Sequence, residues 1–77
     1  MSLTVETVLK ETAGFFAKRG FEAARLEAEL LMAHLLATDR LRLYIEGDRP
    51  LTASEISAYK DLIRHRLSGQ PLAYITG

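Results

Sequence analysis

Residues 25–36 read Arg25-Leu26-Glu27-Ala28-Glu29-Leu30-Leu31-Met32-Ala33-His34-Leu35-Leu36, and they decide how this chain folds. The spacing predicts a helix over residues 23–37 whose apolar side chains cover more than one face. A helix of this kind needs other elements to cover it, so we expect it at the buried centre of a small bundle, with Leu31 and Leu35 both in the core.

The segment before it has the pattern of an amphipathic helix from Thr4 to Arg19. Thr4 is the predicted N-cap, and Gly20 is the predicted residue that closes the helix in a left-handed conformation. Gly14 lies inside this pattern, where glycine costs about 1 kcal/mol relative to alanine. We interpret Gly14 as a point of close packing between helices.

Two more helices are predicted after the central one. A short helix fits Arg40 to Glu46, capped by Asp39 and closed by Gly47. Its apolar residues Leu41, Tyr44 and Ile45 are expected to face inward.

The last predicted helix begins at the capping box Thr52-Ala53-Ser54-Glu55 and stops at Gly69, just before Pro71. The chain is therefore expected to be an all-α bundle of four to five helices over residues 1–70. Residues 71–77 either add a helical turn after Pro71 or begin a strand at residues 74–76.

Composition excludes several classes of protein. Hydrophobic residues make up 48% and charged residues 26% of the 77 residues, as in an ordinary folded domain. Ten basic and ten acidic side chains give no net charge, which argues against a nucleic-acid binder. There is no cysteine, so no disulfide and no thiolate zinc site can form. Neither a membrane span nor a signal peptide is visible, and a soluble cytoplasmic domain is expected.

Few side chains lie in a sequence pattern that is typical of a catalytic or metal-binding site. His34 lies in the apolar stretch without the partners that a metal site needs, and is interpreted as a histidine at the edge of the core. Glu27 and Glu29 project from different parts of one helix, so they do not form an acid–base pair. They are expected either to be solvated or to pair with Arg25 and the start of another helix.

Basic residues supply the only predicted partner contacts. The last predicted helix carries a small basic group that consists of Lys60, Arg64, His65 and Arg66. Asp61 lies among these residues and reduces their net positive charge. We therefore interpret this side of the helix as a solvated face and not as a phosphate contact. The candidates for contact with a partner are Arg40, Arg42, Lys60 and Arg64. No phosphate-binding loop, catalytic triad or HExxH motif is present, so no catalytic, cofactor or metal residue is predicted.

The order of the motifs resembles a known family. The stretch quoted above is followed by Leu41-Arg42-Leu43-Tyr44, by Arg49-Pro50-Leu51-Thr52 and by Arg66-Leu67-Ser68-Gly69-Gln70-Pro71-Leu72-Ala73-Tyr74-Ile75-Thr76-Gly77. This resembles the N-terminal helical domain of the HemK/PrmC family, whose members are S-adenosylmethionine-dependent methyltransferases. The resemblance implies that Gly69, Pro71, Tyr74 and Gly77 belong to a connector toward a catalytic domain.

The resemblance also implies a function. Members of this family methylate the glutamine of the Gly-Gly-Gln motif in class I peptide-chain release factors. Their Gly-rich cofactor loop and Asn-Pro-Pro-Tyr motif lie in a downstream domain, and neither occurs in these residues. The resemblance thus implies an inactive domain that docks the release factor and contacts its own catalytic domain. The alternatives are a nucleic-acid- or ribosome-associated module and a helical dimerisation module.

Overall fold

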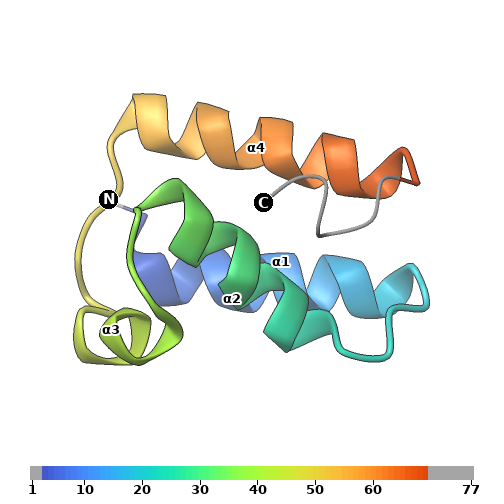
Figure 1. The fold of residues 1–77 in the computed structure, drawn as a ribbon, viewed down its shortest axis with the longest axis horizontal. Coiled ribbons are helices and arrows are strands. Elements are labelled where there is room, and N and C mark those ends of the chain that lie inside the picture. Colours follow the sequence, from blue (N-terminus) through green and yellow to red (C-terminus); the bar gives the residue numbers. More distant parts are fainter. Residues whose placement is uncertain (1–2, 70–77) are drawn as a thin grey trace.

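The computed structural model describes residues 3–69 and contains four helices within them (Figure 1). They are α1 (Val5–Lys18), α2 (Ala24–Leu35), α3 (Arg40–Ile45) and α4 (Ala53–Leu67). The prediction of a small all-α bundle is confirmed. The predicted connector residues Pro71, Tyr74 and Gly77, and the choice between helix and strand there, lie outside the described residues.

Helix α2 is the centre of the bundle, as its apolar pattern predicted. It packs against α1, α3 and α4, and it buries Ala28, Leu31, Met32 and Ala33. Helix α1 runs alongside α2 in the opposite direction, and α4 covers another side (Figure 1). Leu35 is only partly buried against this core, so the expectation that it would be as buried as Leu31 was wrong.

The loop between α3 and α4 holds the beginning of α1. The first N–H groups of a helix have no partner within the helix. Here the Val5 N–H donates to the Arg49 carbonyl at 3.0 Å, and the Glu6 N–H donates to the Gly47 carbonyl at 2.9 Å. Thr4 caps the same end with its side chain, as predicted. The start of α1 and the end of α3 are therefore fixed to each other.

Helix α1 ends as predicted at Gly20, which has a φ of 88°. The next residue, Phe21, donates its N–H to the Phe16 carbonyl at 3.1 Å. The two phenyl rings stack with their centroids 4.7 Å apart. This is the hydrophobic contact that accompanies a Schellman helix end, and it attaches Phe21 to the fully buried Phe16.

Helix α2 ends two residues before the predicted boundary at Ala37. Ala37 has a φ of 54°, and the following Thr38 N–H donates to the Ala33 carbonyl at 2.9 Å. The same Schellman geometry thus ends α2 without a glycine. The sequence offers no glycine or proline there, so the pattern alone extended the helix too far.

Tyr59 joins α4 to the central helix. Its hydroxyl donates to the Ala28 carbonyl at 2.9 Å, and the side chain is 2% exposed. Burial raises the pKa of Tyr59 to about 12, so the phenol stays protonated and remains a donor.

Gly14 was interpreted wrongly as a point of close helix packing. No atom lies within 4 Å of the position where a Cβ would be added at Gly14. The residue is exposed on the surface of α1.

We therefore expect Gly14→Ala to stabilise the chain by about 1 kcal/mol, because it removes the helix-interior cost of glycine. Thermal and urea unfolding measure the change. Gly20→Ala is the matched control, and it should destabilise because its φ of 88° strains an alanine. Destabilisation by Gly14→Ala would show that the site is packed after all.

The burial difference between Leu31 and Leu35 of α2 gives a second expectation. Leu31 is 0% exposed, so Leu31→Ala should cost about 2–5 kcal/mol. Leu35→Ala should cost about 1 kcal/mol, because that side chain loses less contact. If urea unfolding gave equal losses of unfolding free energy for Leu31→Ala and Leu35→Ala, Leu31 would not be closer than Leu35 to the centre of the core.

Candidate partner-contact site

Helix α3 is rotated relative to the prediction. Leu41, Tyr44 and Ile45 were expected to point inward, but they are 68%, 57% and 66% exposed. Leu43 enters the core instead and is 3% exposed. The short helix therefore presents apolar side chains to its surroundings.

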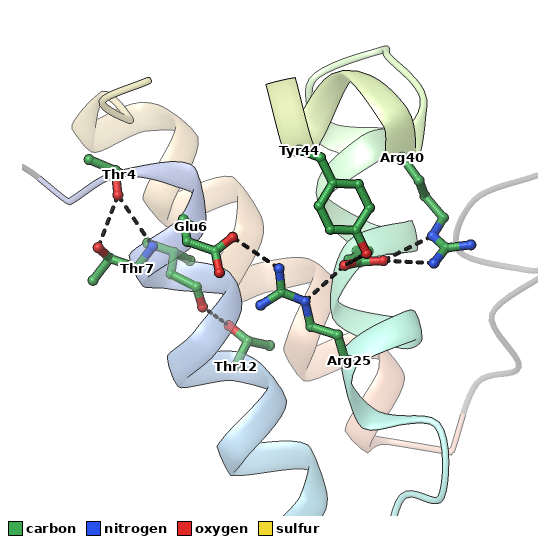
Figure 2. A network of polar contacts seen from close by, with 9 residues as sticks. Thr4, Glu6, Thr7, Thr12, Arg25, Arg40 and Tyr44 are labelled. Carbon is green, nitrogen blue, oxygen red and sulfur yellow. Dashed lines mark hydrogen bonds and ion pairs between the residues drawn. The ribbon is translucent and has the colours of Figure 1, made fainter. Parts of the chain in front are cut away.

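The reason lies in the carboxylate of Glu29, which is 1% exposed. Arg25 Nε donates to Glu29 Oε2 at 2.8 Å, and the Tyr44 hydroxyl donates to the same oxygen at 2.7 Å. Arg40 approaches the other oxygen, Oε1, with Nε and Nη2, both at 2.9 Å. Arg25, Arg40 and Tyr44 converge in Figure 2 from two helices.

These donors decide which side of α3 faces the bundle. Removing a carboxylate from water costs several kcal/mol unless hydrogen bonds replace its hydration. Arg40 and Tyr44 are four residues apart, so they share one side of α3, and both reach Glu29. That requirement turns Leu41 and Ile45, on the neighbouring side, away from the core.

The network continues to α1 through Arg25. Its Nη2 donates to Glu6 Oε2 at 3.0 Å, so Arg25 joins a half-buried and a fully buried carboxylate (Figure 2). Hydrogen bonds to Glu6 and Glu29 raise the pKa of Arg25. Burial alone raises the pKa of Glu29, but the hydrogen bonds from Tyr44, Arg25 and Arg40 outweigh it and hold that pKa below its ordinary value.

The structure separates the four candidate contact residues into two pairs. Arg40 and Arg42 lie on α3. Arg40 binds Glu29, and Arg42 Nε lies 3.6 Å from Glu46 Oε2. Lys60 and Arg64 lie on α4, well away from α3 in Figure 1. Arg64 pairs with Asp61 at 2.9 Å.

The exposed residues of α3 form one continuous candidate site, which we call the α3 surface. It consists of Arg40, Leu41, Arg42, Tyr44 and Ile45. Two open depressions border it. One is about 300 Å³ and is lined by Leu36, Ala37, Thr38, Arg42, Leu43, Glu46 and Arg49. The other is lined by Thr4, Glu6, Thr7, Tyr44, Ile45, Gly47 and Asp48.

The other singled-out polar residues have structural partners or are solvated. Glu29 pairs with Arg25 and with the start of α3, which confirms one of the two predicted alternatives. Glu27 pairs with Arg66 at 2.6 Å. His34 is exposed on α2, so its predicted place at the core edge was wrong. Over residues 3–69, no cluster of His, Cys, Asp or Glu could hold a metal ion.

This geometry defines a small helical domain whose short helix α3 exposes apolar side chains. The family model described as the PrmC N-terminal domain matches residues 7–77, and the chain belongs to that family. The resemblance inferred from the motifs is thereby confirmed. No helix within the described part of the chain has the length and apolar character needed to cross a membrane.

Named relatives agree with this family. The chain is similar to the "Release factor glutamine methyltransferase" of Chlorobaculum tepidum, with 45% identity over 96% of this chain and 25% of that protein. The protein of the same name from Geobacter sulfurreducens is 42% identical over 96% of this chain and 26% of its own length. A "Bifunctional methyltransferase" of Rickettsia conorii is 30% identical over the whole chain and 15% of its own length.

The chain spans about a quarter of the length of these release-factor methyltransferases. No solved structure matches it.

The buried carboxylate gives a pH-dependent expectation. A carboxyl with a lowered folded-state pKa stabilises the fold above its unfolded pKa of about 4.3, and this contribution is lost as the pH falls through the folded pKa. Glu29→Gln should cost about 1–3 kcal/mol at pH 7, because it weakens several charged hydrogen bonds.

Urea unfolding between pH 7 and pH 3 tests this. The difference between the parent chain and Glu29→Gln should shrink toward the acid end. Exposed Glu11→Gln on α1 is the control and should show little change at any pH. A cost of Glu29→Gln that stays constant across the range would contradict the role of the charge.

Proposed function

We propose that this chain is the non-catalytic N-terminal domain of an S-adenosylmethionine-dependent methyltransferase that acts on the Gly-Gly-Gln glutamine of class I release factors. Its role is to dock the release factor while a downstream catalytic domain holds the cofactor and the glutamine loop. The observation that carries the proposal is the similarity to release factor glutamine methyltransferases over 96% of this chain, combined with the exposed apolar α3 surface.

The α3 surface has the composition of a protein contact. Exposed apolar residues in a group mark interaction sites more often than single ones do, and arginine and tyrosine are enriched in such contacts. Leu41 and Ile45 supply the apolar part, Tyr44 adds an exposed aromatic ring, and Arg42 supplies hydrogen-bond donors at the border. Arg40 and Tyr44 are also held in place by Glu29, so this part of the surface is preorganised for a partner.

A remote contact suits the chemistry of the reaction. An amide nitrogen is a weak nucleophile, and a tripeptide motif offers little surface for binding. Binding energy from a distant part of the substrate can position the reacting group, and a tethered docking domain raises the local concentration of that group. The cofactor would bind the catalytic domain, and none of the residues described here is assigned to it.

The pairing of the basic residues disfavours the nucleic-acid alternative. Arg40, Arg42 and Arg64 each lie within 4 Å of a carboxylate oxygen, so their charge is already compensated. The chain as a whole has no net charge. A phosphate backbone is bound by an uncompensated basic surface, whereas mixed apolar and polar side chains suit a folded protein.

Leu41→Glu and Ile45→Glu in the full-length enzyme test the docking role. Both residues are more than 60% exposed, so the fold should tolerate the change. We expect kcat/KM on intact release factor to fall about tenfold, which corresponds to about 1.4 kcal/mol of lost contact. The value on a short Gly-Gly-Gln peptide should stay the same.

Phe15→Ser is the matched control, because Phe15 is 40% exposed near the far end of α1. It should leave both substrates unaffected. Equal losses on the protein and the peptide would mean that the domain only stabilises its neighbour. The nucleic-acid alternative would be supported instead if the unmutated enzyme bound RNA with a steep salt dependence and the α3 variants lost that binding.

A further inference from the structure

The end of α4 carries a second polar cluster, separate from the α3 surface. Arg66 Nε donates to Glu27 Oε1 at 2.6 Å. The guanidinium carbon of Arg66 lies 4.7 Å from the centroid of the Phe21 ring. Three segments meet here: the α1–α2 loop, the first turn of α2 and the last turn of α4.

This cluster is anchored in the core. Phe21 stacks on Phe16, and Phe16 is 0% exposed. The side chains of Arg66 and Glu27 are 25% and 17% exposed, so the pair is largely shielded from water. A shielded charge-assisted hydrogen bond and a cation–π contact are each stronger than their solvated counterparts.

Apolar packing also holds the last turns of α4. Beyond the buried Tyr59, its apolar residues Leu62, Ile63 and Leu67 are only partly buried. Helix ends open with little free energy unless side chains fix them. Arg66 adds a directional polar contact to this apolar packing at the end of α4, directly before Gly69, which has a φ of 96°.

We propose that Arg66, held by Glu27 and Phe21, is a positioning residue that sets the direction in which the chain leaves the helical domain. This inference rests on the proposed function, in which a catalytic domain follows. A tethered docking domain increases the rate only when its attachment lets both contacts form together. A freely swinging end of α4 would dock the release factor without placing its glutamine loop in the active site.

The test uses the full-length enzyme with Arg66→Leu, Arg66→Lys and Glu27→Gln. Spin labels on a cysteine at Lys10, in a chain without native cysteine over residues 1–77, and on the catalytic domain report the distance between the domains. We expect Arg66→Leu to broaden the distance distribution and to lower kcat/KM on intact release factor three- to tenfold. Arg66→Lys, which keeps the charge but not the planar group, should give an intermediate result.

Arg19→Leu is the matched control, since Arg19 also lies over a phenyl ring, that of Phe15, at 4.9 Å. It should change neither readout. Unchanged distances and rates in Arg66→Leu would overturn the inference. If Arg66→Leu loses helical content, the interdomain distances and kcat/KM values of Arg66→Lys and Glu27→Gln test the positioning role instead. An unmutated enzyme that fails to methylate the release factor would refute the proposed function, while the distances would still test the positioning role.

Discussion

The buried carboxylate of Glu29 is the constraint on which the arrangement of α1, α2 and α3 depends. It lies in the central helix among apolar residues, where an unpaired charge could not remain. Arg25, Arg40 and Tyr44 replace its hydration, and Arg25 extends the network to Glu6. Within residues 3–69, no buried side-chain nitrogen or oxygen lacks a hydrogen-bond partner. Satisfying this one charge fixes how α3 is rotated against the bundle.

The two glutamates of α2 bind two different parts of the molecule. Glu29 binds α3 and so exposes Leu41 and Ile45, whereas Glu27 binds Arg66 at the end of α4. In our proposal the first part contacts the release factor and the second directs the chain toward the catalytic domain. Both glutamates belong to the first half of the central helix, so one element carries the two contacts.

The helices were predictable because their signals are local. The cap at Thr4, the capping box at Thr52 and the end at Gly20 depend on neighbouring residues, and the structure confirms each of them. The rotation of α3 was not predictable from its own apolar spacing, because it depends on a charge eleven residues earlier in the sequence than Arg40. One signal was available: Glu29 follows Arg25 by four residues, a spacing that favours an ion pair on a helix, and it directly precedes the apolar run from Leu30 to Ala33.

The central claim is that Glu29 is held ionised by its three donors, and a direct titration of its side-chain carboxyl by carbon-13 NMR tests it best. The account predicts a midpoint below the ordinary glutamate value of about 4.3, and an upward shift of that midpoint in Arg40→Leu. A midpoint at or above the ordinary value in the parent chain would show that burial dominates, and it would contradict the claim that this charge orients α3.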